Sequence, residues 1–334
     1  MPDGDLRLGL LISIQDPADS RFDHRRLYAA TIEQAREAEE LGYHWINAAE
    51  HHATADGYLP APLTLLAAIA TATEEIRLST GMLVLTLHHP LVIAEQAAVL
   101  DVVSGGRLTL GIASGYRELE FEALGVEFEG RGRRFRESLE IMVEAWKGEP
   151  FSYAGKVFQI PEITVAPRPA QRPHPPLWLG GFGDVALTRA ARWGSPCFPG
   201  GTTEIHNVEK LYSHYQELAA AKGLADSGLL LQRFSVVAET TEEARRLAYP
   251  GLRYTLEQYK SWGRPVEVEE IMGDWDRLDD TVIVGDEKRC AEQIARYREL
   301  GVSDMMLQFQ LPLTDPEVAR ESMRRFQAAA SSVD

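Results

Sequence analysis

The chain has 334 residues, of which 45% are hydrophobic and 25% are charged, an ordinary composition for a globular protein. Its 50 acidic residues outnumber the 34 basic ones, so a nucleic-acid surface and binding to anionic membranes are both disfavoured. No apolar run is long enough to cross a membrane. Cys197 and Cys290 stand far apart with no CxxC motif, which argues against a disulfide scaffold or a cysteine zinc site. These features predict a reduced, cytoplasmic enzyme with no nucleic-acid or membrane partner.

Segments with strand-like and helix-like periodicity alternate along the chain. The first, LRLGLLISI at 6–14, has no basic flank and is interpreted as a strand rather than a signal peptide. Further strands are expected at 43–48, 76–85, 107–114, 176–181, 196–200, 229–239 and 304–311. Helices are expected at 25–42, 61–73, 90–106, 131–147, 184–194, 203–223, 241–260, 287–301 and 316–330.

This alternation predicts one α/β domain over residues 1–334, a (β/α)8 TIM barrel with insertions. The segment at about 149–168 has alternating aromatic residues around AGK and predicts a hairpin insertion. The segment at about 261–281 breaks the pattern and forms either a lid or an ordinary packed loop. Because the sites of such barrels lie at the carboxyl ends of the strands, functional residues are expected there.

The second predicted strand runs into a carboxylate and two imidazoles, Glu50, His51 and His52. Adjacent side chains of an extended chain point to opposite faces, so Glu50 and His52 would share one face and His51 the other. Three ligands to one metal are then awkward, and we expect no metal site. Histidine suits proton transfer near neutral pH or stabilisation of developing charge. A second pair, His88 and His89, follows the third strand, so either pair could instead serve capping or packing.

The ends of the fourth and fifth strands carry small residues. Ser114, Gly115 and Tyr116 leave the fourth strand, where a ligand could approach the backbone or the chain could simply turn. After the fifth strand, glycines at 180, 181 and 183 precede a helix, and exposed amides there favour a phosphate. Residues 181–186 match the G-x-G-x-x-A dinucleotide pattern, yet no acidic residue ends the next strand to bind a ribose. A monophosphate site is favoured over a pyrophosphate site or plain turn glycines, with Asp184 as a compatible helix N-cap.

Four stretches resemble the bacterial luciferase-like flavin monooxygenases: LRLGLLIS, AEHHATADGYLPAP, STGMLVLTLHHPLVIAEQAAVLDVVSGGRLTLGIASGY and LGGFGDVALTRAARWG. The resemblance implies a (β/α)8 barrel that binds reduced FMN, or the deazaflavin F420 in a sister group. It places His51 at the active-site histidine. It places Gly81 and Met82 at a non-prolyl cis peptide against which the flavin ring rests. It also places the turn with Gly181, Phe182 and Gly183 at the FMN phosphate.

Two departures from the light-emitting members matter. Ser114 stands where they have an arginine for the phosphate, and Ala113 where they have a reactive cysteine. We therefore expect neither light emission nor a long-chain aldehyde substrate. Phosphate binding is expected to depend on the turn after the fifth strand, with help from Ser114 and Arg117.

The resemblance therefore implies a two-component monooxygenase. A separate flavin reductase would supply FMNH2, and a flavin C4a-hydroperoxide would pass one atom of O2 to a small apolar or aromatic substrate. Two alternatives stay open: an F420-dependent oxidoreductase that transfers hydride, and a non-catalytic flavin-binding subunit. The family's habit of pairing barrels, with the apolar helices at 61–73 and 90–104, suggests a homodimer.

Overall fold

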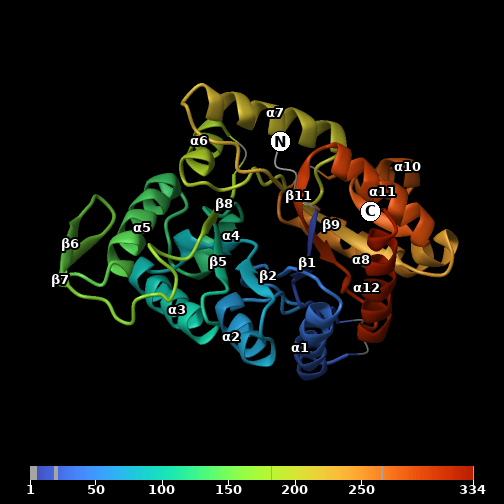
Figure 1. Cartoon of the computed structure of the whole chain (residues 1–334), viewed down its shortest axis with the longest axis horizontal. Helices are drawn as coiled ribbons and strands as arrows, with labels where there is room; N and C mark the ends of the chain where they lie inside the picture. Colours follow the sequence, from blue (N-terminus) through green and yellow to red (C-terminus); the bar gives the residue numbers. More distant parts are fainter. Residues whose placement is uncertain (1–5, 19–21, 182, 265, 334) are drawn as a thin grey trace.

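The protein is described by a computed structural model covering residues 6–18, 22–181, 183–264 and 266–333. Strands lie at the centre of the molecule and helices surround them (Figure 1). The elements in chain order are β1 (Arg7–Ile12), α1 (His24–Glu40), β2 (Trp45–Ala48), α2 (Pro62–Ala72), β3 (Arg77–Thr80), β4 (Leu83–Val84), η1 (Leu85–Leu87), α3 (Pro90–Val103), β5 (Leu108–Ala113), α4 (Glu118–Ala123), α5 (Arg131–Trp146), β6 (Phe151–Ala154), β7 (Gln159–Ile163), β8 (Leu177–Leu179), α6 (Asp184–Arg192), α7 (Ile205–Ala220), β9 (Leu229–Val237), α8 (Thr241–Ser261), α9 (Val268–Met272), α10 (Trp275–Leu278), β10 (Val282–Gly285), α11 (Glu287–Glu299), β11 (Val302–Gln308) and α12 (Pro316–Ser331).

The central strands pair in parallel and in barrel order. β1 pairs with β11 on one side and β2 on the other, and the ladder continues through β3, β5 and β8. β9 pairs with β11 and β10, and a parallel bridge joins Leu229 at its start to Cys197. All these carboxyl ends therefore meet at one end of the sheet, which makes that end the place for a site.

Two predicted strands differ in detail, and one observed strand was not predicted. The strand expected at 76–85 is divided into β3 and β4, and the one at 196–200 is reduced to the bridge at Cys197. Val282–Gly285 forms an additional strand, β10, that the sequence interpretation did not include. β10 has only four residues and follows the irregular segment at 261–281. Its apolar run is too short to show the periodicity by which a strand is predicted.

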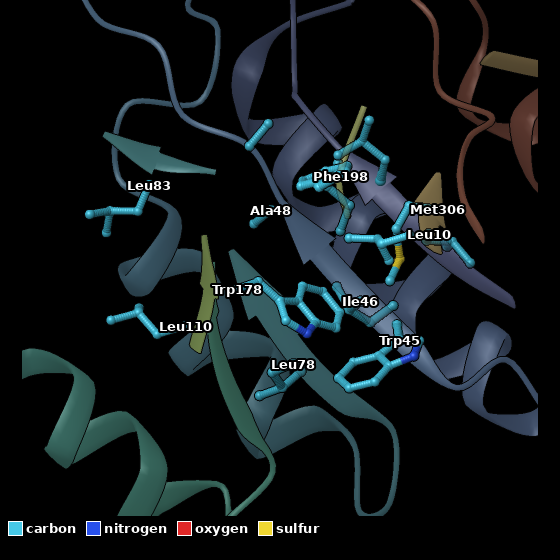
Figure 2. Packing of buried hydrophobic residues seen from close by; sticks show 14 of the residues in the cluster. Leu10, Trp45, Ile46, Ala48, Leu78, Leu83, Leu110, Trp178, Phe198 and Met306 are labelled. Carbon is cyan, nitrogen blue, oxygen red and sulfur yellow. The ribbon is translucent and has the colours of Figure 1, made fainter. Parts of the chain in front are cut away.

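The core consists of apolar residues from the strands and from the inner faces of the helices. β2 and β8 are buried along their whole lengths, as expected for strands covered on both faces. Inside the sheet, the rings of Trp45 and Trp178 lie 4.8 Å apart, and Leu10, Ile46 and Leu110 lie around them (Figure 2). Each fully buried aliphatic side chain contributes roughly 1.5–3 kcal/mol to folding, so this packing holds the strand ends in fixed positions.

Two segments lie outside the alternating pattern. The predicted hairpin is present: β6 and β7 form a separate antiparallel sheet on the outer side of α5 (Figure 1). The segment at 261–281 contains the end of α8 and the short helices α9 and α10. Within the described residues, none of the helices combines the length and hydrophobicity that a membrane span requires.

Candidate active site

The division between β3 and β4 falls at a non-prolyl cis peptide between Gly81 and Met82, as the resemblance implied. A Cβ atom at residue 81 would lie 1.6 Å from Oδ1 of Asn47, so only glycine fits there. The Gly81 amide donates to the Ala48 carbonyl over 2.8 Å, and Gln232 Nε2 donates to the Gly81 carbonyl over 3.2 Å. Neighbouring strands therefore hold this bulge at the carboxyl end of β3.

Glu50, just after β2, links that bulge to two histidines. One carboxylate oxygen accepts a hydrogen bond from the Val84 amide. The other lies 2.9 Å from His88 Nε2 and 3.2 Å from His52 Nε2. Burial opposes ionisation of Glu50, yet its hydrogen-bond partners lower its pKa to about 2. The Glu50 carboxylate in turn raises the pKa of His52. A buried anion flanked by two imidazoles thus fixes the start of β4.

The same three side chains have the atoms that a metal ion would need. The ligand atoms of Glu50, His52 and His88 lie within 4.8 Å of one another. Glu50 and His52 share a face, as expected from the sequence, whereas His88 was not expected to join them. His88 is 36 residues after His52 in the chain, so nothing local in the sequence joins them. In this structure the imidazoles contact the Glu50 carboxylate directly.

His51 faces the other way and bonds to a carboxylate that the sequence interpretation missed. Its Nδ1 lies 2.7 Å from Oε1 of Glu120, whose side chain is buried. Burial opposes ionisation of Glu120, but the hydrogen bond from His51, the His52 amide and the Arg117 cation give a net lowering of its pKa. An ionised Glu120 favours a proton on Nδ1, which leaves Nε2 free to accept one. That nitrogen lies 3.5 Å from the Tyr116 hydroxyl.

Aromatic rings surround this histidine. The centroids of Tyr58, Tyr116 and Trp262 lie 4.8, 5.7 and 4.5 Å from that of His51. Trp262 follows α8 directly, so the irregular segment at 261–281 reaches the reactive end of the barrel. The Arg117 guanidinium lies 4.7 Å from the centre of the Trp262 ring. His51 is consequently 9% exposed, which shields it from most of the solvent.

The expectation that Arg117 serves the phosphate is not supported by its contacts. Its guanidinium donates to the carbonyls of His52 and Ala53 and lies 3.4 Å from Glu120. Arg117 therefore orders the loop after β2 and the dyad of His51 and Glu120. The charge of an arginine near Ser114 suggested that it binds a phosphate. In the folded chain, however, the guanidinium donates to a carbonyl that lies 64 residues earlier in the sequence.

The turn after β8 presents backbone and small side chains. A Cβ at residue 180 would lie 3.4 Å from atoms of both Ala113 and Met82, so this turn adjoins the end of β5 and the cis bulge. Gly181 has φ +144°, and a Cβ there would lie 2.5 Å from the Ala186 Cβ. Phe182 lies outside the described residues. A ligand could thus approach the backbone at the start of α6.

Asp184 occupies a different position from the one expected. The N-cap of α6 is Gly183, and Asp184 is the first helical residue, with Oδ1 2.9 Å from Nε2 of His214. Among the described residues, no side chain caps the amides at this helix start. Ser114 and Gly115 leave β5 nearby, and Gly115 has φ +71° where a Cβ would lie 2.7 Å from Val84. The predicted residues of β3, β5 and β8 are therefore brought together at one end of the barrel.

The family model for luciferase-like monooxygenases matches residues 7–304. The chain is 31% identical over 247 residues to the oxygenase component of a flavin-dependent trigonelline monooxygenase from Acinetobacter baylyi, covering 72% of this chain and 67% of that one. It is 28% identical over 265 residues to an FMNH2-dependent dimethylsulfone monooxygenase from Pseudomonas putida, covering 73% and 72% of the two chains.

A monooxygenase structure from Streptomyces bottropensis superposes with a TM-score of 0.84 at 25% identity, over 97% of this chain and 98% of that one. The fold is the (β/α)8 barrel of this class. The chain belongs to the luciferase-like monooxygenase family, and it is an oxidoreductase.

Proposed function

We propose that this protein is the oxygenase component of a two-component monooxygenase that uses FMNH2 delivered by a separate reductase. The observation that carries the proposal is the dyad of His51 and Glu120 at the same barrel end as the Gly81–Met82 bulge and the open turn at Gly181. The relatives are a flavin-dependent oxygenase component and an FMNH2-dependent enzyme, which supports this assignment.

The residues present fit FMN. A Cβ at residue 81 would meet the Asn47 side chain and one at residue 181 the Ala186 side chain, so both positions keep glycine and present main chain to a ligand. The uncapped amides around Gly183 suit a dianionic phosphate, by hydrogen bonding and by the helix dipole. Gly81 and Met82 would support the flavin ring, with Ser114, Gly115 and Tyr116 on the neighbouring strand end. Bound reduced FMN would supply the electrons that activate O2.

The protein's own residues would then control protons and water. Glu120 holds the proton of His51 on Nδ1, so Nε2 can take or return a proton near the Tyr116 hydroxyl. Trp262 and Arg117 cover the imidazole and exclude water, which protects reactive oxygen chemistry from side reactions. In this role the segment at 261–281 acts as a lid. Glu50 keeps β4 in place, beside the position that the flavin ring would occupy.

One experiment separates this proposal from F420-dependent hydride transfer. The protein is titrated anaerobically with FMNH2 and, separately, with reduced F420, and O2 uptake is then followed with a panel of aromatic and apolar substrates. The proposal predicts saturable FMNH2 binding and substrate-dependent O2 uptake. Oxidation of a substrate by F420 without O2 would replace it with the alternative, and flavin binding without any turnover would favour a non-catalytic subunit.

We also propose a homodimer formed through α3. Val92, Val99 and Val103 are 46%, 48% and 50% exposed and recur at helical spacing on its outer face. A second copy that covers this face would bury them. Sedimentation of the wild type is expected to give a dimer, whereas Val99→Lys is expected to give a monomer whose FMN affinity is unchanged. A monomeric wild type at micromolar concentration would contradict the proposal.

A further inference from the structure

Arg264 carries a positive charge that no carboxylate of the described residues pairs with. Among the described residues its side chain makes neither a hydrogen bond nor an ion pair, and the guanidinium lies 5.5 Å from the ring centre of Tyr116 and 5.1 Å from that of Tyr259. Other arginines near the site are paired: Arg117 with Glu120, and Arg253 with Glu257. Stacking on aromatic rings holds the Arg264 guanidinium in place and leaves its five N–H donors available.

This guanidinium belongs to the surroundings of His51. Tyr116, on one side of it, has its hydroxyl 3.5 Å from His51 Nε2. Tyr259, on the other side, lies 5.7 Å from Trp262, the ring that covers His51. One aromatic ring, Tyr116, therefore separates Arg264 from the reactive imidazole on the first route, and two rings, Tyr259 and Trp262, separate them on the second.

The same cluster combines a ring face with hydrogen-bond donors. Tyr116 is 43% exposed, whereas Tyr58, which also contacts His51, is 6% exposed. Burial raises the pKa of Tyr58 and Tyr116, and the Tyr259 hydroxyl raises both further, so these hydroxyls stay protonated. Within the described residues, the hydroxyls of Tyr58 and Tyr259 make no hydrogen bond. A planar ligand could pack on Tyr116, while a charged group on that ligand would meet Arg264.

We propose that Arg264 is a carboxylate subsite, and that the substrate is an aromatic carboxylic acid whose ring packs against Tyr116. This inference rests on the proposed function for the reaction itself. Guanidinium pairs with carboxylate through two parallel hydrogen bonds, which fixes a ligand's orientation as well as its charge. The chain carries 50 acidic and 34 basic side chains, so an anionic substrate needs a local cation to be held near His51.

The test compares probes that differ only in charge. Benzoate and nicotinate are titrated by calorimetry into the full-length protein saturated with FMN, in parallel with benzamide and nicotinamide. Three proteins are compared: wild type, Arg264→Gln and Arg246→Gln. Arg246 is a matched control because it is an exposed arginine on α8, and within the described part of the chain Glu243 is its only ion-pair partner. A charged hydrogen bond corresponds to about tenfold in affinity, so the wild type is expected to bind each acid about tenfold more tightly than its amide.

Arg264→Gln is expected to remove that preference by weakening the acids and leaving the amides within about twofold, and Arg246→Gln is expected to keep it. The inference is overturned if the wild type binds acid and amide equally, if it binds neither, or if Arg264→Gln preserves the preference. Thermal melting of the variants checks that they fold. FMNH2 binding and O2 uptake are measured on the same samples: their failure would count against the monooxygenase proposal, whereas the acid preference tests Arg264 by itself.

Discussion

The end of β2 and the turn after β8 lie at the same end of the barrel, but the first presents buried side chains and the second presents open main chain. After β2, Glu50 and His51 are buried and their polar atoms have close partners, with the charge of Glu50 opposed by neighbouring imidazoles. After β8, Gly181 and Gly183 leave the backbone open, and Asp184 points to His214 on the surface. The first region holds side chains in one arrangement for proton chemistry, and the second holds main chain ready for an anion. Changes to the two regions should therefore have separable effects on catalysis and on FMN binding.

The largest effect is expected from His51→Ala. Without the imidazole, no group takes or returns a proton beside Tyr116, so turnover should fall by roughly 10²- to 10⁴-fold. FMN affinity should stay within about twofold of the wild type, because the phosphate and ring would be held by other strand ends. Steady-state O2 uptake and equilibrium flavin titration measure the two quantities, with His206→Ala as an exposed histidine control. Unchanged turnover would remove His51 from the mechanism.

Glu120→Gln should come next, with a loss of about 10²-fold or more in turnover. A glutamine amide can donate to His51 Nδ1 and so shift the proton to Nε2, the wrong tautomer for a base. Glu118→Gln, an exposed neighbour on α4, is expected to leave turnover unchanged. If the two glutamine variants behaved alike, Glu120 would have only a structural role.

Glu50→Gln is expected to reduce stability more than it reduces the chemical step. It leaves His52 and His88 facing a neutral amide, and removing one partner of a buried ion pair costs about 3–5 kcal/mol in free energy of unfolding. The folded-state pKa of about 2 lies below the ordinary value of 4.5, so the stabilisation is present above pH 4.5 and is lost as the pH falls toward 2. In denaturant titrations, the free energy of unfolding of the wild type should decrease as the pH falls through that window. An equally steep dependence in Glu50→Gln would show that another group is responsible.

A smaller effect is expected from Gly181→Ala, which tests the second region alone. The added methyl group would lie 2.5 Å from Ala186, so the turn must shift and the FMN dissociation constant should rise about tenfold. Riboflavin lacks the phosphate and should lose much less affinity. Gly132→Ala on α5 is the control, because no atom lies within 4 Å of the added carbon and this glycine is outside the proposed phosphate site. Turnover at saturating FMNH2 should persist in both variants.

Much of the barrel followed from periodicity, because long buried strands and amphipathic helices give strong repeating patterns. The sequence also placed His51 and Gly81 at strand ends, where the fold concentrates chemistry. It could not join Glu120 to His51, since the two are 69 residues apart and α4 is only six residues long. It likewise gave no sign that Trp262 covers His51 or that Arg117 serves the loop after β2, because long-range side-chain contacts leave no local period.

The central claim is that FMN binds at the end of the barrel where His51 and the Gly181 turn meet. A crystal structure of the protein soaked with FMN tests it most directly. The account predicts the flavin ring against Gly81 and Met82, within contact of His51, and the phosphate on the amides at the start of α6. Flavin bound on another face of the molecule, or an empty barrel end in crystals of active protein, would contradict it.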